Sequence, residues 1–508
     1  MKNFLVFFLL SLLARIVFSH HVGLIDDEAY HWTWSQDLML SYYDHPGMIA
    51  WLERISTMMF GNTIWGVRLP SFICYVLAVY FMWQLTKQMF DEAAACFVGA
   101  IMLWSPFWGF GGYVASPEPP FMLCWVLACY IFWQGTRPDD NRWSVAKTWI
   151  LLGLVMGLGL NSKFIIALLA PGFGLYLLFT RQRRDLLTRW PWVGFLIATL
   201  LCIPIFAWNI DFDWPGFRYQ FHDRHTGESF SFARWIKWFG IQFFFYTPVL
   251  YPLLLLSFGW AFKNRKTYRW AFLFYLTLPS MVIFYVQPFF ADYKPHWAGA
   301  AHLILLMGAG AFYSHGLKWG EKYLIGAHSS ALRKNLIGFH IFYNILVYSP
   351  FLGPWVPTAY NFVKDKFNLK ENWETKWDFS NEFTGWEDLG QRLIDKQRFI
   401  YAETGRKPHF AALRYETTAQ TWWGSKEKTY MMSSTRSHYT VTQFHRGDFE
   451  KLKGSDFLVV TTEKYQANPF EYADWGKCTP EYLKTFRANV HARTFTIWYC
   501  QNFKELKN

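Results

Sequence analysis

The chain has 508 residues, of which 53% are hydrophobic and 21% are aromatic, but only 17% are charged. Roughly a quarter of the residues of soluble proteins are charged, so this composition excludes an ordinary soluble protein and indicates a membrane protein. The net charge of +12 does not indicate nucleic-acid binding, because the basic residues fall in short loops between apolar segments, where they set membrane topology.

Apolar segments long enough to cross a bilayer recur along the first 356 residues. They predict a mainly α-helical, polytopic membrane protein with about eleven transmembrane helices. With the N-terminus inside, seventeen Lys and Arg residues fall in inside loops and seven in outside loops, as the positive-inside rule requires. The first segment is predicted to be a retained helix, because no signal-peptide cleavage site follows it. The predicted spans are 4–19, 67–90, 93–110, 117–135, 148–160, 163–180, 190–209, 236–262, 270–288, 297–314 and 337–356.

The loop after the first span begins with three consecutive acids, Asp26, Asp27 and Glu28. Acids at a membrane boundary are costly to desolvate, and adjacent carboxylates repel one another, which raises the pKa of at least one of them. Such a group suits a general base near neutral pH. The alternative is a helix N-cap, which a single Asp would satisfy. Residues 29–34 then predict an amphipathic helix at the membrane interface.

A second carboxylate, Asp44, lies in the same loop between Tyr43 and His45. It is a candidate for orienting a substrate, and the alternative is a turn closed by Asp44 and Pro46. Glu118 lies in a proline-rich turn at the outer end of a predicted span. A divalent metal shared by Asp44 and Glu118 is an option, although carboxylates alone do not establish one.

Cationic and imidazole side chains gather in later turns that the charge count also places outside. Lys163 lies between two apolar runs, where it either snorkels at the boundary or binds a phosphate. The loop 211–225 is interpreted as an anion cradle for a leaving phosphate, or alternatively as an aromatic-rich interface loop. The loop 291–297 repeats the same residue types. The candidate phosphate-binding residues, beside Tyr43, His45, Glu118 and Lys163, are Arg68, His222, Arg224, His225, Lys294 and His296.

These polar motifs fall at one boundary of the predicted bilayer, which suits an enzyme with a lipid-borne substrate. A transporter is expected to place its coupled polar residues near the midplane of the membrane. The sequence contains no Gly-rich nucleotide-binding motif, so a soluble nucleotide substrate is not indicated.

The composition becomes polar towards the C-terminus, which divides the chain into a transmembrane domain, 1–360, and a small outside α/β domain, 361–508. Residues 385–398 predict an amphipathic helix, and strands are predicted at 399–404, 456–463 and 495–503. Cys478 and Cys500 can pair if this domain is exported. The other five cysteines lie in apolar segments and are interpreted as core residues.

The segment DDEAYHWTWSQDLMLSYYDHPGMIAWLERISTMMFGNTIWGVRLPS, residues 26–71, resembles the opening of bacterial dolichyl-phosphate-mannose–protein mannosyltransferase-like proteins. These belong to the GT-C superfamily, which includes the lipid A aminoarabinose transferase and the galacturonosyltransferases of lipopolysaccharide. The segments SPEPPFMLCWVLACYIF, GLGLNSKFIIALLAPG, WNIDFDWPGFRYQFHDRH and PHWAGAAHL are similar to later motifs of the family, and GWEDLGQRL is similar to the start of its small soluble domain. The resemblance covers nearly the whole chain in order.

The resemblance implies a GT-C fold with interfacial helices in the first periplasmic loop. It also implies a glycosyltransferase that uses a polyprenyl (undecaprenyl) phosphate-linked sugar and transfers the sugar with inversion. The enzyme is then expected in the bacterial inner membrane, with its active site and C-terminal domain on the periplasmic side. Lipid A or lipopolysaccharide is the acceptor expected from the family.

The same resemblance assigns roles to individual residues. The catalytic first-loop aspartate of the family corresponds to Asp27, with Glu28 beside it, and the turn acid and the lysine correspond to Glu118 and Lys163. The second acidic position corresponds to Asp44-His45, where related transferases often carry Glu-Lys. A neutral imidazole is a weaker phosphate partner than lysine.

The expected reaction is a single displacement, in which Asp27 orients or deprotonates the acceptor. Lys163 and the cationic residues of loop 211–225 steady the leaving phosphate. A protein acceptor, as in protein O-mannosylation, is the alternative within the same class. A glycolipid transporter or flippase is the alternative from another class.

Overall fold

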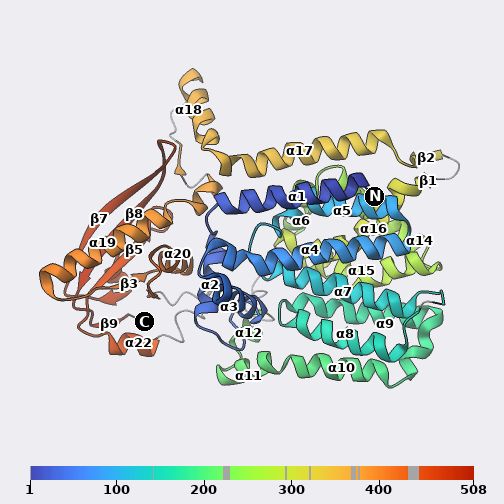
Figure 1. Cartoon of the computed structure of the whole chain (residues 1–508), viewed down its shortest axis with the longest axis horizontal. Helices are drawn as coiled ribbons and strands as arrows, with labels where there is room; N and C mark the ends of the chain where they lie inside the picture. Colours follow the sequence, from blue (N-terminus) through green and yellow to red (C-terminus); the bar gives the residue numbers. More distant parts are fainter. Residues whose placement is uncertain are drawn as a thin grey trace. The chain divides into compact units, whose positions relative to one another are not determined.

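The structure is a computed structural model that describes residues 2–140, 142–220, 229–291, 294–319, 322–367, 373–375, 378–432 and 446–507. Helices dominate the chain, and most strands follow residue 408 (Figure 1). This confirms the predicted mainly α-helical protein with a small sheet. The chain forms two compact units. Unit 1 contains Met1–Phe18, Met39–Leu52 and Arg68–Ile345, and unit 2 contains Ser19–Leu38, Glu53–Val67 and Leu346–Asn508.

Unit 1 consists almost entirely of apolar helices, with one short hairpin of β1 (Leu317–Trp319) and β2 (Lys322–Ile325). Helices α1 (Lys2–His21), α3 (Met48–Phe60), α4 (Ile64–Met89) and α17 (Ser330–Leu352) contribute residues to both units. The other helices are α5 (Glu92–Trp104), α6 (Pro106–Phe110), α7 (Glu118–Thr136), α8 (Val145–Leu160), η1 (Phe164–Leu168), α9 (Leu169–Phe179), η2 (Arg181–Leu187), α10 (Trp190–Leu201), α11 (Ile203–Asp211), α12 (Pro215–Arg218), α13 (Phe232–Tyr246), α14 (Leu250–Lys263), α15 (Tyr268–Val286), η4 (Gln287–Phe289), η5 (Pro295–Ala298) and α16 (Gly299–His315).

Each predicted span contains a helix, but the described helices do not establish eleven crossings. Among the described residues, five helices are long and apolar enough to cross a membrane, or up to eight if each of three bent pairs is one span. The segment 236–262, predicted as one span, is divided into α13 and α14, which are bent by 109° at a break. Thr247 lies in this break with φ 70°, and Pro248 follows it, so the helix cannot continue.

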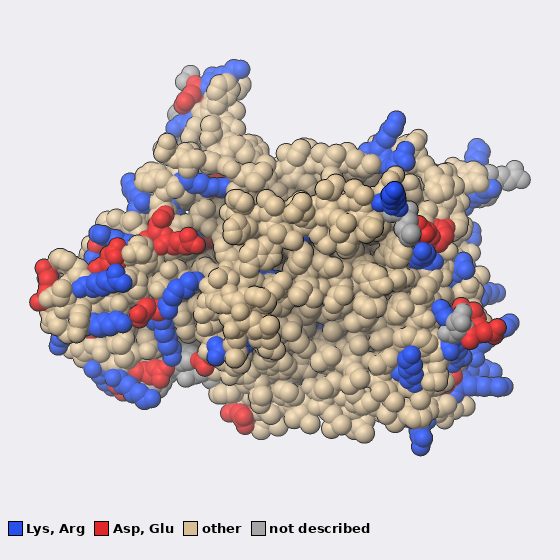
Figure 2. Space-filling model, in the orientation of Figure 1, with Lys and Arg blue, Asp and Glu red and all other residues tan. Residues whose placement is uncertain are grey.

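Small residues bring the helices of unit 1 into close contact. A Cβ added to Gly153 of α8 would lie 2.3 Å from the carbonyl oxygen of Gly194 in α10, so no larger side chain fits without a shift. In Figure 2, Lys and Arg gather at the end of unit 1 that carries the N-terminus and β1–β2, whereas the flank of its helices is nearly free of charge. An uncharged flank with basic residues at the helix ends is typical of a membrane protein.

Unit 2 contains a five-stranded sheet with the strand order β4-β3-β5-β8-β7. The pairs β3–β4 and β3–β5 are parallel, and the pairs β5–β8 and β8–β7 are antiparallel. The strands are β3 (His409–Ala412), β4 (Thr429–Met431), β5 (Phe457–Thr462), β7 (Lys477–Arg487) and β8 (Val490–Gln501), with a separate pair of β6 (Ala473–Asp474) and β9 (Glu505–Leu506). The strands predicted at 456–463 and 495–503 are confirmed as β5 and part of β8.

One sequence prediction for this region is wrong. Residues 399–404 are not a strand but the last turns of α19 (Trp386–Thr404), and Gly405 caps its C-terminus with φ 68°. The apolar face of α19 includes Ile400 and packs on the sheet, so the helix extends through the short run of β-branched and aromatic residues. The remaining helices of unit 2 are α2 (Asp26–Gln36), α18 (Trp355–Phe367), η7 (Phe379–Phe383), α20 (Tyr415–Ser425), α22 (Arg446–Lys451) and η8 (Pro469–Glu471).

Cys478 and Cys500 form a disulfide between β7 and β8, where the two residues are paired directly across the strands. The other five cysteines are free. The helix predicted at residues 29–34 is confirmed as part of α2, but it is not amphipathic, because residues 28–35 are all buried. This helix packs mainly on α20 within unit 2.

Candidate active site

Lys163 lies in a turn of unit 1 that hydrogen bonds hold from several sides. The Asn161 side-chain amide donates to the carbonyl oxygen of Leu201 at 2.7 Å, and the Ser162 hydroxyl donates to that of Pro117 at 2.7 Å. The backbone amide of Met48 donates to the carbonyl oxygen of Asn161 at 2.9 Å. The turn therefore joins the ends of α8 and α10, the start of α7 and the start of α3.

The Lys163 ammonium is buried and forms an ion pair with the carboxylate of Glu118 at the start of α7. Lys163 is only 6% exposed, and a buried charge is costly unless it is paired. The side chains of His45 and His296 lie close enough to Glu118 to act on its charge. The fold thus brings together four residues from four separate sequence motifs, all of them candidates from the sequence.

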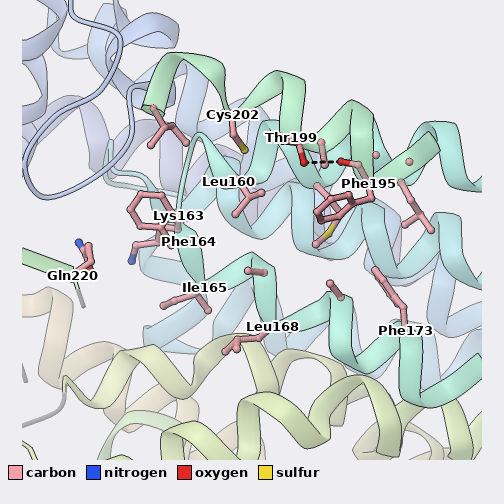
Figure 3. Close-up of a pocket in the computed structure, with 18 of the residues that line it drawn as sticks. Leu160, Lys163, Phe164, Ile165, Leu168, Phe173, Phe195, Thr199, Cys202 and Gln220 are labelled. Atoms are coloured by element: carbon pink, nitrogen blue, oxygen red, sulfur yellow. Dashed lines mark hydrogen bonds between the residues drawn. The ribbon is translucent and has the colours of Figure 1, made fainter. Parts of the chain in front are cut away.

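A long apolar cavity of about 860 Å³ begins at this cluster. Apolar residues of α8, η1, α9, α10 and α11 form most of its lining. Lys163, His45 and Gln220 also line it. Figure 3 shows the Lys163 nitrogen and the Gln220 amide at one end, with Phe173 and Phe195 far from them along the cavity. The cavity therefore combines a polar head with an extended apolar body.

The second acidic position lies beside this cavity. The Gln220 amide donates to the backbone carbonyl of Asp44 at 2.6 Å, and the rings of Tyr43 and Tyr219 pack at 4.6 Å. The Tyr42 amide donates to the carbonyl of His45 at 3.2 Å, which closes the turn that the sequence suggested as the alternative for Asp44. This turn presents His45 to the cavity.

The remaining candidate residues lie outside the cavity lining or outside the described residues. Arg68 is buried in α4, and Lys294 is exposed just before η5. His222, Arg224 and His225 lie in 221–228, outside the described residues. Among the residues that are described, no group of three or more His, Cys, Asp or Glu side chains could hold a metal ion. Glu118 is paired with Lys163, and a metal shared by Asp44 and Glu118 stays a prediction.

The acid triplet lies in unit 2, at the start of α2, and its three members have different environments. Glu28 is fully buried, and its carboxylate accepts a hydrogen bond from the Ile25 backbone amide at 3.0 Å. The capping interaction is therefore made by Glu28, and not by an Asp as the helix-cap alternative supposed. The Asp26 carboxylate instead accepts from the Gln420 amide at 3.1 Å. Asp27 is exposed and accepts from the Tyr415 hydroxyl at 3.4 Å.

Burial raises the pKa of Asp26 to about 7, and the nearby Arg493 guanidinium opposes this shift. Repulsion from the like charges of Glu382 and Glu416 raises the pKa of Asp26 further. The sequence correctly predicted that one acid of the triplet would have a raised pKa. The main cause, however, is burial in unit 2 and not repulsion within the triplet.

The comparisons with known proteins support one family. Residues 44–208 match the family model of dolichyl-phosphate-mannose-protein mannosyltransferase. The chain is 25% identical over 279 residues to the lipid A galacturonosyltransferase RgtD of Rhizobium johnstonii, which covers 54% of this chain and 58% of the relative. It is 27% identical over 278 residues to the undecaprenyl phosphate-alpha-4-amino-4-deoxy-L-arabinose arabinosyl transferase 1 of Pseudomonas fluorescens, which covers 50% of this chain and 47% of that relative. The chain thus spans about half the length of these curated relatives.

Two solved structures match over almost the whole chain. ArnT from Cupriavidus metallidurans bound to undecaprenyl phosphate has a TM-score of 0.64 at 14% identity, and the match covers 98% of each chain. The apo structure of the same protein gives a TM-score of 0.62 at 13% identity, again over 98% of each chain. The chain has an ArnT-like GT-C fold. The family-model match and the curated relatives confirm the resemblance on which the sequence analysis relied.

Within the GT-C fold, three polar residues of interest were missed by the sequence analysis. Gln220 and Gln420 are neutral amides, which carry no signal of function until their partners are known. Glu53 of α3 is completely buried, and no described residue forms a hydrogen bond with its carboxyl oxygens. Burial, followed by repulsion from Glu28, holds the pKa of Glu53 well above its usual range. In the sequence, Glu53 looked like an ordinary charged residue of an amphipathic helix.

Proposed function

We propose that this chain is a membrane glycosyltransferase that takes a sugar from a polyprenyl-phosphate donor and transfers it to lipid A or lipopolysaccharide. The observation that carries the proposal is the cavity with Lys163 at one end and apolar walls along its length. A polyprenyl phosphate has the same two parts, an anionic head and a long hydrocarbon chain. The buried ammonium can bind the phosphate through charge-assisted hydrogen bonds.

The relatives support this donor and acceptor class. One of them is named as a lipid A galacturonosyltransferase and another as an undecaprenyl phosphate-alpha-4-amino-4-deoxy-L-arabinose arabinosyl transferase. The solved structure with the same fold is of a protein bound to undecaprenyl phosphate. Because a fold hosts many functions, the donor cavity of this chain and not the fold alone carries the proposal.

The proposed reaction is a single displacement with inversion. The acceptor oxygen attacks the anomeric carbon, the bond from that carbon to the donor phosphate oxygen breaks, and polyprenyl phosphate leaves as an anion. Lys163 stabilises the developing phosphate charge, with His45 and His296 as further partners. A hydroxyl acceptor passes its proton to Asp27, whereas an ionised lipid A phosphate needs Asp27 only for orientation.

We further propose that the protein lies in the bacterial inner membrane, with unit 2 on the periplasmic side. The basic residues gathered at one end of the unit 1 helices support a cytoplasmic assignment for that end. The Cys478–Cys500 disulfide supports an oxidising compartment for the C-terminal α/β fold.

The donor site is tested with purified protein in nanodiscs and a polyprenyl-phosphate sugar carrying a radiolabel in the sugar. Lys163→Met should lower transfer about 100-fold or more, because the phosphate loses its buried cation. Lys147→Met is the matched control, since Lys147 lies over the ring of Trp143 away from the cavity. Equal transfer by both variants would contradict the donor site.

The acceptor is tested by mass spectrometry of lipid A and of periplasmic glycoproteins from a strain that lacks the gene. Loss of a sugar from lipid A, restored by wild-type protein and not by Asp27→Asn, is the expected result. Loss of a sugar from proteins instead would favour the protein O-mannosyltransferase-like alternative. If lipid A and the proteins keep their sugars in the deletion strain and a glycolipid accumulates on one side of the membrane, the result would favour a flippase.

A further inference from the structure

The geometry points to α20 of the C-terminal α/β fold as a positioning element of the reaction: Tyr415 and Gln420 hold Asp27 and Asp26 in place at the start of α2. This inference rests on the proposed function, because it concerns the acids that are proposed to serve the acceptor. All of the residues concerned belong to unit 2. The sequence separation of almost 400 residues means that only the fold brings them together.

Gln420 fixes the chain where it enters α2. Its side-chain nitrogen donates to the carbonyl oxygen of Leu24 at 2.8 Å and to the Asp26 carboxylate at 3.1 Å. Gln420 is completely buried, so water does not compete for either bond. One amide therefore holds both the backbone before the helix and the first acid of the triplet.

Tyr415 acts on the neighbouring acid. Its hydroxyl donates to Asp27 Oδ1 at 3.4 Å, and its ring packs edge-on against Tyr30 of α2 at 4.9 Å. A hydroxyl donor stabilises the ionised carboxylate and limits the rotamers of Asp27. Both effects suit a base that must be charged and aimed at the acceptor.

The packing of α20 makes it a rigid support. A Cβ added to Gly424 would lie 2.2 Å from the carbonyl oxygen of Trp386, so α20 and α19 are in backbone contact. On the side of α2, Trp32 packs edge-on against Trp422 at 5.9 Å and Trp423 at 5.1 Å. A shift of α20 would therefore have to move α2 and α19 together.

The charged groups around these acids come from several elements of unit 2. Asp27 and Glu28 share α2 with Asp26, and Glu416 lies on α20, where it pairs with Arg414 at 3.4 Å. Glu382 of η7 and Arg493 of β8 also act on Asp26. Removal of the Tyr415 hydroxyl takes one stabilising donor from Asp27 and leaves this surrounding set unchanged.

The experiment compares Tyr415→Phe with wild type over a range of pH in the nanodisc transfer assay. The variant keeps the ring against Tyr30 and loses only the hydroxyl. We expect kcat to fall roughly tenfold, as for the loss of one hydrogen bond to a charged group, with the donor KM changed less than twofold. The acidic limb of the pH–rate profile should move to higher pH, because Asp27 loses a donor that favours its charged form. Tyr401→Phe, at an exposed tyrosine of α19, is the matched control.

A second measurement does not depend on activity. Gln420→Met removes the amide donor at similar volume and should increase hydrogen exchange of the first hydrogen-bonded α2 amides, at residues 29–32, by tenfold or more. A Tyr415→Phe enzyme with normal kcat and an unchanged pH profile, or a Gln420→Met protein with unchanged exchange, would overturn the inference. If wild-type protein transfers no sugar, the proposed function fails, while the exchange experiment still decides whether α20 holds the start of α2.

Discussion

The two units contain buried charged residues that are handled in opposite ways. In unit 1, Lys163 is paired with Glu118, so its charge is held at a fixed place at the head of an apolar cavity. In unit 2, Asp26 and Glu53 are desolvated, and the pKa of each is raised. The comparison therefore sets an ion-paired site in unit 1 against desolvated carboxyl groups in unit 2.

The largest effect is expected for Asp27→Asn, which removes the proposed base from unit 2. Transfer to a hydroxyl acceptor should fall about 1,000-fold, within the range found for general bases. Thermal unfolding should be unchanged because Asp27 is exposed. Asp37→Asn, at the other end of α2, is the control. Normal transfer by Asp27→Asn would remove the base from unit 2 and break the comparison.

The next effect concerns the stability of unit 2 alone. Replacing both Cys478 and Cys500 by Ala should lower its free energy of unfolding by about 3 kcal/mol, because the bond closes a loop between residues 22 apart in sequence. Proteolysis monitored by mass spectrometry can report each unit separately. Equal loss of protection in unit 1 helices would show that the two units do not unfold independently.

A smaller effect is expected at the ion-paired site of unit 1. Glu118→Gln leaves Lys163 buried without its carboxylate partner, which should cost about 2 kcal/mol after allowance for the partial exposure of Glu118. The double variant Glu118→Gln with Lys163→Met should recover part of this loss in a thermal unfolding cycle. If the double variant is no more stable than Glu118→Gln, the ion pair does not account for the stability of the turn.

The smallest effect tests the raised pKa of Asp26 through the pH dependence of stability. The pKa of Asp26 is about 7 in the folded chain, above its ordinary value of 3.8. Below pH 4 the group is protonated in both states and costs nothing, and stability is lost as pH rises from about 4 to 7 because the unfolded chain releases the proton first. Asp26→Asn should thus be more stable than wild type by about 1 kcal/mol at pH 8 and equal to it at pH 4. A constant difference at all pH values would contradict the raised pKa.

Much of the fold was predictable from local pattern. The helical segments, strands β5 and β8, and the pairing option for Cys478 and Cys500 follow from hydrophobic periodicity and residue type. Residues 399–404 were misassigned because a short aromatic and β-branched run looks strand-like. In the structure they continue α19, whose apolar face packs on the sheet. The break at Thr247 could have been suspected from Pro248, but the apolar composition on both sides concealed it.

The chemistry of the candidate site was predictable only one motif at a time. Residue type and position selected Lys163, Glu118, His45 and His296, and the fold of unit 1 brings them together. Glu53, Gln220 and Gln420 could not be selected, since burial and hydrogen-bond partners are properties of the packed chain.

The sequence by itself determined the membrane class, the helical segments and the family resemblance, because hydrophobic pattern and short motifs are local. Only the tertiary structure decided which acid of the triplet caps α2, which one has a raised pKa, and which distant helix holds them. Solvent exclusion and hydrogen bonds between residues 24–27 and 415–420 exist only after the chain has packed. The physical reason is that desolvation depends on all neighbours in space, whereas a motif records only neighbours along the chain.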